Sequence, residues 1–378
     1  MNNIDFPYFA FLRYSLNVGT PLPESARHID WMQMLEWAEQ QAIVGIIYGG
    51  ITDVRSQRED GRGSALQIPF DALMEWVGYA QQIEAQNRLM NIRCVEIVEE
   101  LRKGGFELCI LKGQGNALMY PNPLLRMSGD IDVWVCGAKE GRREGTSKSA
   151  VSEVISYVRM RNPDGKTVYH HIDYGLFKGV EVEVHYRPTF MNNLIVNRRL
   201  QRWMQEKADG GWLMAELPEG AGEIPVPTWE FNVVFQLSHI YRHVIQSGVG
   251  MRQMVDYYYL LKSDGRCMME DVSNSLEYLG LMEIAGAVMW VLKEVLGLEE
   301  RYLVAPVDER RGRFLLSEIM EGGNFGREMM AEGGWQSSAI GRNVYRLKRD
   351  VRLLRYFPSE CLWEPVFRVY HFFWRIGV

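Results

Sequence analysis

Apolar residues recur at helical spacing along the first hundred residues of the chain. Residues 31–51 and 70–105 place apolar side chains three or four positions apart, the period of a helix with one buried face. The second segment ends in two glycines, which commonly follow a helix C-terminus. The pattern predicts a helical N-terminal region, residues 1–103.

The period changes after Phe106. FELCILKG is a short apolar run that ends in a glycine turn, and DIDVWV is a second strand-like run. Residues 149–161 then have the pattern of a helix, closed by Asn-Pro-Asp-Gly. In residues 166–188, two strand-like runs flank Lys178-Gly179, which predicts an antiparallel hairpin.

The remainder of the chain, after residue 190, has a helical pattern interrupted once by a Pro/Gly-rich segment. We interpret that segment, residues 217–228, as a linker. The predicted fold class is therefore α+β, with a small mixed-sheet core, residues 104–216, between helical N-terminal and C-terminal regions. The C-terminal helical domain is expected over residues 228–378.

Composition narrows the class of protein. The chain has 378 residues, 47% of them apolar and 24% charged, which is typical of a globular protein. The formal net charge of −6 argues against a protein that coats nucleic acid over its whole surface. Five scattered cysteines without a Cys-x-x-Cys pair, and no signal peptide or long apolar run, predict a cytoplasmic protein without a transmembrane segment.

The strand that begins with Asp-Ile-Asp carries the first candidate chemistry. Residues two apart in a strand share a face, so Asp130 and Asp132 point one way while Ile131 and Val133 enter the core. Neighbouring carboxylates repel each other unless a cation lies between them. Glu183, on the polar face of the later hairpin strand, could add a third ligand. Three such carboxylates can hold two divalent ions for displacement at phosphorus, with Mg²⁺ expected and Mn²⁺ as the alternative.

The turn upstream suits the same chemistry. Gly113 and the nearby Gly115 allow the backbone to approach a phosphate closely. Lys112 and Arg126 can supply positive charge near that phosphate.

The segment LKGQGNALMYPNPLLRMSGDIDVWV resembles an uncharacterised bacterial nucleotidyltransferase family of the DNA polymerase β-like nucleotidyltransferase superfamily. VEVEVHYRP is similar to a later strand of that family, and residues 239–261 resemble its downstream helix. The resemblance implies that Asp130, Asp132 and Glu183 bind the metal and carry catalysis. It also implies that Lys112, Gly113 and Gln114 face the nucleotide phosphates, although the superfamily usually has Ser or Gly where Gln114 stands.

The histidines allow two interpretations. His239 and His243 are four residues apart and share a helix face, with Arg252 and Asp256 farther along the chain. His243 and Asp256 are candidate substrate contacts, and the alternative is a buried polar network between two domains. His185 could also contact substrate, or be a hydrogen-bonded structural histidine. His170 and His171 are adjacent, so at most one of them is expected to face the site.

The favoured function is a metal-dependent nucleotidyltransferase that transfers a nucleoside monophosphate from a nucleoside triphosphate to an acceptor hydroxyl. The acceptor, whether small molecule, protein or nucleic acid, is left open. The alternatives are a non-catalytic nucleotide-binding regulatory module and a small-molecule phosphotransferase. A basic segment, residues 342–358, with the aromatic-rich segment after it, could bind an acidic partner, RNA or a membrane surface, or could cover the fold.

Overall fold

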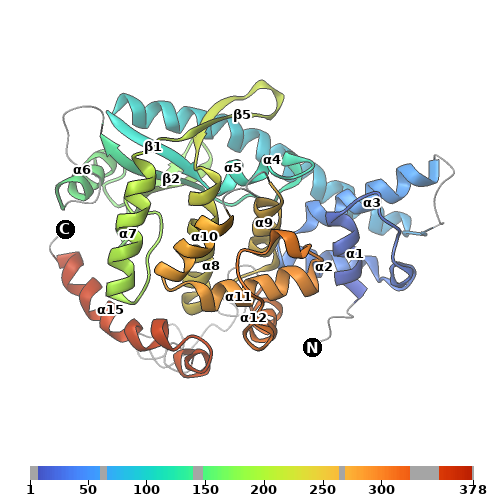
Figure 1. Ribbon diagram of the computed structural model, residues 1–378. Coiled ribbons are helices and arrows are strands. Elements are labelled where there is room, and N and C mark those ends of the chain that lie inside the picture. Colours follow the sequence, from blue (N-terminus) through green and yellow to red (C-terminus); the bar gives the residue numbers. More distant parts are fainter. Residues whose placement is uncertain (1–6, 60–65, 139–147, 264–268, 324–348, 377–378) are drawn as a thin grey trace, which may run out of the picture.

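A computed structural model describes residues 7–59, 66–138, 148–263, 269–323 and 349–376 (Figure 1). It contains a four-stranded sheet and a two-stranded sheet among many helices. The α+β class predicted from the sequence is confirmed.

The larger sheet is mixed. Its strands are β1 (Phe106–Leu111), β2 (Ile131–Ala138), β3 (His171–Phe177) and β4 (Val180–His185). Their order is β1-β2-β4-β3; β2 and β4 run parallel, and the other neighbours are antiparallel. The predicted hairpin is confirmed, because β3 and β4 pair across Lys178-Gly179.

The two faces of the sheet have different partners, because alternate side chains along each strand point to opposite faces. Ile131, Val133 and Val182 lie in an apolar cluster with residues of α4 (Phe70–Lys103) and α6 (Lys148–Arg159).

The opposite face meets α7 (Leu194–Ala208) and α8 (Trp229–Gln246). There Trp134 of β2 stacks on Phe231 of α8, with 5.3 Å between the ring centroids. In Figure 1, α4 runs behind the sheet, and α7 lies in front of it. The functional side chains come from this second face.

The N-terminal region is helical, as expected. Its helices before α4 are α1 (Pro7–Leu16), α2 (Trp31–Gln40) and α3 (Val44–Glu59). Asp30 begins α2 by accepting hydrogen bonds from the amides of Met32 and Gln33. Helices α2 and α3 are separate because Ala42 between them has a positive φ of 56°.

The prediction of a linker over residues 217–228 is wrong for most of that segment. The chain there completes a hairpin of β5 (Leu213–Leu217) and β6 (Gly222–Val226). Leu217 and Ile224 are buried in the cluster that also holds α4 and β1. Gly220 and Gly222 take the positive φ angles that the turn between the strands requires.

The C-terminal part is helical. After α8 it contains α9 (Met251–Lys262), α10 (Met269–Tyr278), α11 (Met282–Trp290), α12 (Glu309–Gly322) and α15 (Pro358–Ile376). None of the helices in the described ranges has the length and apolar content that crossing a membrane requires. The expected cytoplasmic location stays a prediction. Residues 342–348 of the basic segment lie outside the described residues.

One apolar cluster connects the predicted regions. It includes Phe9 of α1, Trp134 of β2 and Cys361 of α15, so side chains from all three parts of the chain share a core. The division into residues 1–103, 104–216 and 228–378 stays a prediction.

Candidate functional site

The three predicted acidic residues lie together at the start of β2. The parallel pairing of β2 with β4 sets the Cα of Asp132 opposite that of Glu183. Asp130 immediately precedes β2. All three line one pocket with a volume of about 270 Å³. Strand alternation thus brings together carboxylates that lie about fifty residues apart in sequence.

Asp132 is buried and held by two cations. Its carboxylate lies 2.9 Å from the Nζ of Lys112 and 2.8 Å from the Nε2 of His185. Burial opposes ionisation of Asp132, but Lys112 and His185 outweigh it and lower the pKa of this carboxyl. Asp132 is therefore charged at neutral pH.

Glu183 is held by two imidazoles. Its Oε2 lies 3.0 Å from the Nδ1 of His171 and 3.3 Å from the Nε2 of His185. Burial acts against the charge, yet both rings lower the pKa of Glu183. Burial also disfavours protonation of His185, but its contacts to Asp132 and Glu183 raise the pKa of the ring to about 9.

Asp130 is in a different electrostatic situation. The charge of Asp132, together with burial, raises the pKa of Asp130 to about 6. Among the described residues, no ion pair or side-chain hydrogen bond holds this carboxylate. A divalent cation beside Asp130 and Asp132 would relieve the repulsion between them, so the donor set suits a hard cation.

The turn after β1 places Lys112 and Gly113 at the pocket. Both residues have positive φ angles, 49° and 44°, before the short helix α5 (Gly113–Ala117). The Nζ of Lys112 lies between Asp132 and the Nε2 of His239, which is 3.2 Å away.

Gln114 points away from the pocket. Its buried side chain donates to Asn91 of α4 and accepts a hydrogen bond from Ser128. The side chain therefore fixes the turn against α4, and a contact of Gln114 with the nucleotide stays a prediction.

Arg126 and Asp256 form a buried pair at another wall of the pocket. Arg126 donates two hydrogen bonds to Asp256, at 2.7 and 2.8 Å, and Tyr120 donates a third at 2.5 Å. Burial works against the charge of Asp256, but Arg126 lowers the pKa of this carboxyl below its usual value. The pair joins the segment before β2 to helix α9, which fits the buried-network interpretation. A contact of either residue with substrate stays a prediction.

Helix α8 contributes four polar residues to the pocket: His239, Arg242, His243 and Gln246. The rings of His239 and His243 are 4.3 Å apart, and His243 Nδ1 lies 2.7 Å from the hydroxyl of Ser247. Burial lowers the pKa of the Arg242 guanidinium to about 10. Among the described residues, the guanidinium has hydrogen-bond partners only in imidazoles, including that of His170, and it forms no ion pair with a carboxylate.

Sequence reasoning gave Arg242 no role. The signal was present, because residue 242 lies three positions after His239 and so shares the helix face that carries the two histidines. A buried guanidinium whose neighbours are neutral rings suits an anionic ligand.

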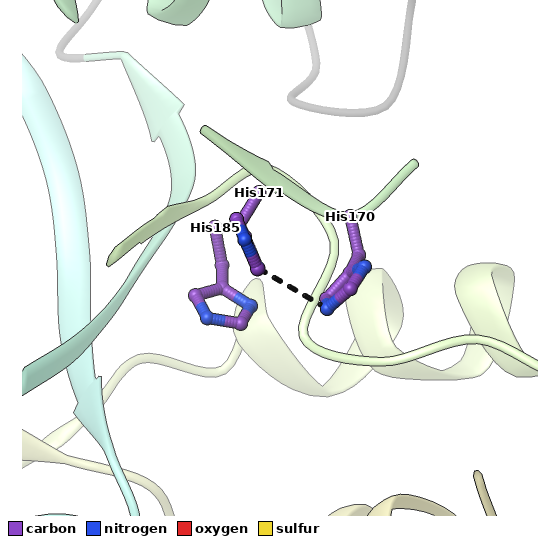
Figure 2. Close-up of side chains that lie close together, drawn as sticks. All are labelled: His170, His171 and His185. Carbon is purple, nitrogen blue, oxygen red and sulfur yellow. Dashed lines mark hydrogen bonds between the residues drawn. The ribbon is translucent and has the colours of Figure 1, made fainter. Parts of the chain in front are cut away.

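Both adjacent histidines face the site, so the expectation that at most one does is wrong. His170 lies before β3, where strand alternation does not yet apply. The Nδ1 of His171 is 3.2 Å from the Nε2 of His170. Figure 2 shows these two rings gathered with that of His185.

Comparison with known proteins gives a family match and a match to a solved structure. A family model described as "Uncharacterised nucleotidyltransferase" matches residues 27–297. Over 61% of its length the chain is similar to the crystal structure of an "antigenic nucleotidyltransferase-like protein from Paracoccidioides brasiliensis", with 12% identity and a TM-score of 0.34. That match covers 96% of the solved chain. No curated protein matches.

Proposed function

The chain belongs to the uncharacterised nucleotidyltransferase family, and from that premise we propose that it transfers a nucleoside monophosphate from a nucleoside triphosphate to an acceptor hydroxyl. The observation that carries the proposal is the parallel register of β2 and β4. It sets Asp132 beside Glu183, and Asp130 lines the same pocket, whose wall also includes lysine and arginine side chains.

The three carboxylates are the proposed ligands of a divalent cation, with Mg²⁺ favoured and Mn²⁺ as the alternative. Bound there, such an ion would neutralise charge on the triphosphate and on the reacting oxygens. Asp130 supports the assignment most strongly, because the charge of Asp132 destabilises its ionised form and the nearby Lys112 compensates only in part.

Two side chains are the proposed partners of the phosphate oxygens. Lys112 reaches the pocket from the turn after β1, and Arg242 reaches it from α8. Arg242 can form charge-assisted hydrogen bonds with an anion without first giving up a carboxylate partner in the described part of the chain. A triphosphate between the two would therefore lie against the acidic cluster.

In the proposed reaction, the acceptor oxygen forms a bond to the α-phosphorus while the bond from that phosphorus to the bridging oxygen breaks. Pyrophosphate leaves, and the proton of the acceptor hydroxyl passes to a carboxylate. Asp130 is the proposed proton acceptor, because it lines the pocket and no ion pair among the described residues holds its carboxylate.

Labelled ATP tests this reaction. The protein is incubated with Mg²⁺, a small-molecule extract and ATP labelled at either the α or the γ phosphate, and products are identified by mass spectrometry. We expect the α label on the acceptor and the γ label in pyrophosphate. Transfer of the γ label to an acceptor would instead establish a phosphotransferase. Binding of Mg²⁺ and ATP without any turnover would support the regulatory module. Repeating the assay with each triphosphate gives the base preference.

A further inference from the structure

The polar face of the β3–β4 hairpin has more nitrogen ligands than a magnesium site requires. We propose that His171, Glu183 and His185 bind a transition-metal ion, of the Mn²⁺, Co²⁺ or Zn²⁺ class, through two imidazole nitrogens and a carboxylate oxygen. The proposal concerns which metal this site prefers. Any role of that metal in catalysis rests on the proposed function.

Antiparallel register assembles the ligands. His171 pairs directly with His185, and Asp173 pairs with Glu183. Residues two apart in a strand share a face, so all four side chains emerge from the same side of the hairpin. Figure 2 shows the rings of His171 and His185 turned toward a common region.

The distances match those between ligands of one ion. Two ligand atoms that each lie about 2.1 Å from a metal are about 3.0 to 3.4 Å apart in octahedral or tetrahedral geometry. Glu183 Oε2 lies 3.0 Å from the Nδ1 of His171 and 3.3 Å from the Nε2 of His185. Glu183 Oε2 therefore lies at a ligand-to-ligand distance from a nitrogen of each imidazole.

The second nitrogen of each ring faces an acceptor. The Nε2 of His171 is 3.2 Å from Asp173, and the Nδ1 of His185 is 3.4 Å from the carbonyl oxygen of Arg187. Histidines that bind metals commonly donate their other N–H to a carboxylate or a backbone carbonyl, which fixes the ring and its tautomer. Each imidazole thus has one nitrogen toward Glu183 and the other toward a supporting group. The Nε2 of His185 also lies 2.8 Å from Asp132, so a bound ion would take the place of the proton between these two groups.

His170 is left out of the ligand set. Although its Nε2 lies 3.2 Å from His171, the same atom contacts the guanidinium of Arg242. A nitrogen that accepts a hydrogen bond from arginine is not available to a metal.

The chemistry of the donors selects the metal. Mg²⁺ prefers oxygen ligands and retains several waters, whereas imidazole suits Zn²⁺ and its neighbours in the first transition row. Two imidazoles beside Glu183 therefore favour a transition ion over Mg²⁺ at this position.

The competing explanation is that the two rings serve as internal cations that balance the acidic cluster. The explanations predict opposite effects when an imidazole is removed. If His171 is a ligand, its loss weakens metal binding. If it is a counter-cation, its loss leaves the carboxylates more negative and strengthens the binding of every divalent ion.

Metal titration of the full-length, EDTA-treated protein tests the proposal. Co²⁺ binding is followed by visible absorption and calorimetry, and Mg²⁺ binding by calorimetry alone. We expect Co²⁺ to bind at least about tenfold more tightly than Mg²⁺. His171→Gln should weaken Co²⁺ binding by about tenfold or more without weakening Mg²⁺ binding. Unchanged or tighter Co²⁺ binding in this variant would overturn the proposal.

Two further variants make the test independent of folding defects. Asp173→Asn replaces the carboxylate that supports His171 with a neutral, weaker acceptor, and it should weaken Co²⁺ binding by about 10-fold or more. Glu181→Gln is the matched control, because Glu181 is an exposed carboxylate two residues before Glu183 that is not part of the pocket lining, and the variant's Co²⁺ affinity should stay that of the wild type. Wild-type Co²⁺ affinity in Asp173→Asn, with the fold intact by circular dichroism, would also contradict the assignment.

The result is separable from the proposed function, because no nucleotide is present. Transition-metal binding without nucleotidyl transfer would contradict the proposed function and support the proposed metal site. Nucleotidyl transfer with Mg²⁺, in a protein that shows no preference for Co²⁺, would contradict the proposed metal site and support the proposed function.

Discussion

Asp130 and Asp256 line the same pocket but have opposite surroundings. Asp256 accepts two hydrogen bonds from Arg126 and one from Tyr120, and Arg126 helps to lower its pKa. Asp130 has no described ion-pair partner, and the charge of Asp132 raises its pKa to about 6. The charge of Asp256 is therefore balanced by hydrogen-bonded partners, while the charge of Asp130 is disfavoured by the neighbouring Asp132.

The difference separates a structural carboxylate from a functional one. A fully bonded, paired carboxylate contributes to the native state, and removing one partner leaves an uncompensated buried charge. A carboxylate held beside others of like charge costs stability, and such sites are frequent where a ligand or metal binds. Substitutions of the two aspartates should therefore affect different properties.

The largest expected effect is on activity, in Asp130→Asn. A bound metal stabilises the transition state by several kcal/mol, and each 1.36 kcal/mol changes a rate tenfold. We expect nucleotidyl transfer to fall by at least about a thousandfold on these grounds. Stability without metal should be equal or higher, because the repulsion from Asp132 is gone. The measurements are transfer of labelled nucleotide and thermal melting in EDTA; a marked fall in melting temperature would mean that Asp130 is structural.

Asp256→Asn should do the reverse. It leaves the guanidinium of Arg126 buried beside a neutral amide, at a cost of about 3–5 kcal/mol of unfolding free energy. Metal binding per folded molecule should be retained. Urea denaturation measures the loss, and a stability close to that of the wild type would contradict the structural role.

The pH dependence of this loss has a definite sign. Asp256 has a lowered pKa in the folded state, so its contribution is present above the unfolded value of 3.8 and disappears as pH falls further. The stability difference between the wild type and Asp256→Asn should therefore be constant near neutral pH and shrink below about pH 4.

The contrast also shows what the sequence could predict. Alternation along DIDVWV and VEVEVH was enough to put Asp130, Asp132 and Glu183 on polar faces, because strand geometry is local. The Arg126–Asp256 pair could not be foreseen as a pair. Its members are 130 residues apart, and only packing of α9 against the segment before β2 joins them.

Two errors have local causes. The β5–β6 hairpin resembles a linker in sequence because glycine and proline are frequent in both, and its three buried residues, Leu217, Ile224 and Pro225, do not recur at a clear period. His170 was assigned a strand geometry that begins only at His171. Element boundaries, unlike the elements, depend on tertiary contacts that a single sequence does not reveal.

A smaller effect is expected for Arg242→Gln, which tests whether the pocket that contains Asp130 binds phosphate. Losing charge-assisted hydrogen bonds worth about 1.5–3 kcal/mol should weaken ATP binding by about 10- to 150-fold. The dissociation constant is measured by calorimetry with Mg²⁺ present. Arg198→Gln, a change on the exposed surface of α7, is the control and should bind ATP like the wild type. Equal affinity in both variants would exclude a phosphate contact by Arg242.

The smallest effect is expected for Tyr120→Phe, which removes one of the three hydrogen bonds to Asp256 and leaves both from Arg126. The buried carboxylate keeps its charge partner, so the unfolding free energy should fall by only about 1 kcal/mol, well below the loss in Asp256→Asn. Urea denaturation of both variants gives the ratio. A loss in Tyr120→Phe as large as that in Asp256→Asn would show that the phenol, and not the guanidinium, makes Asp256 tolerable in the folded protein. The distinction between a satisfied and an unsatisfied aspartate would then rest on hydrogen bonding instead of charge.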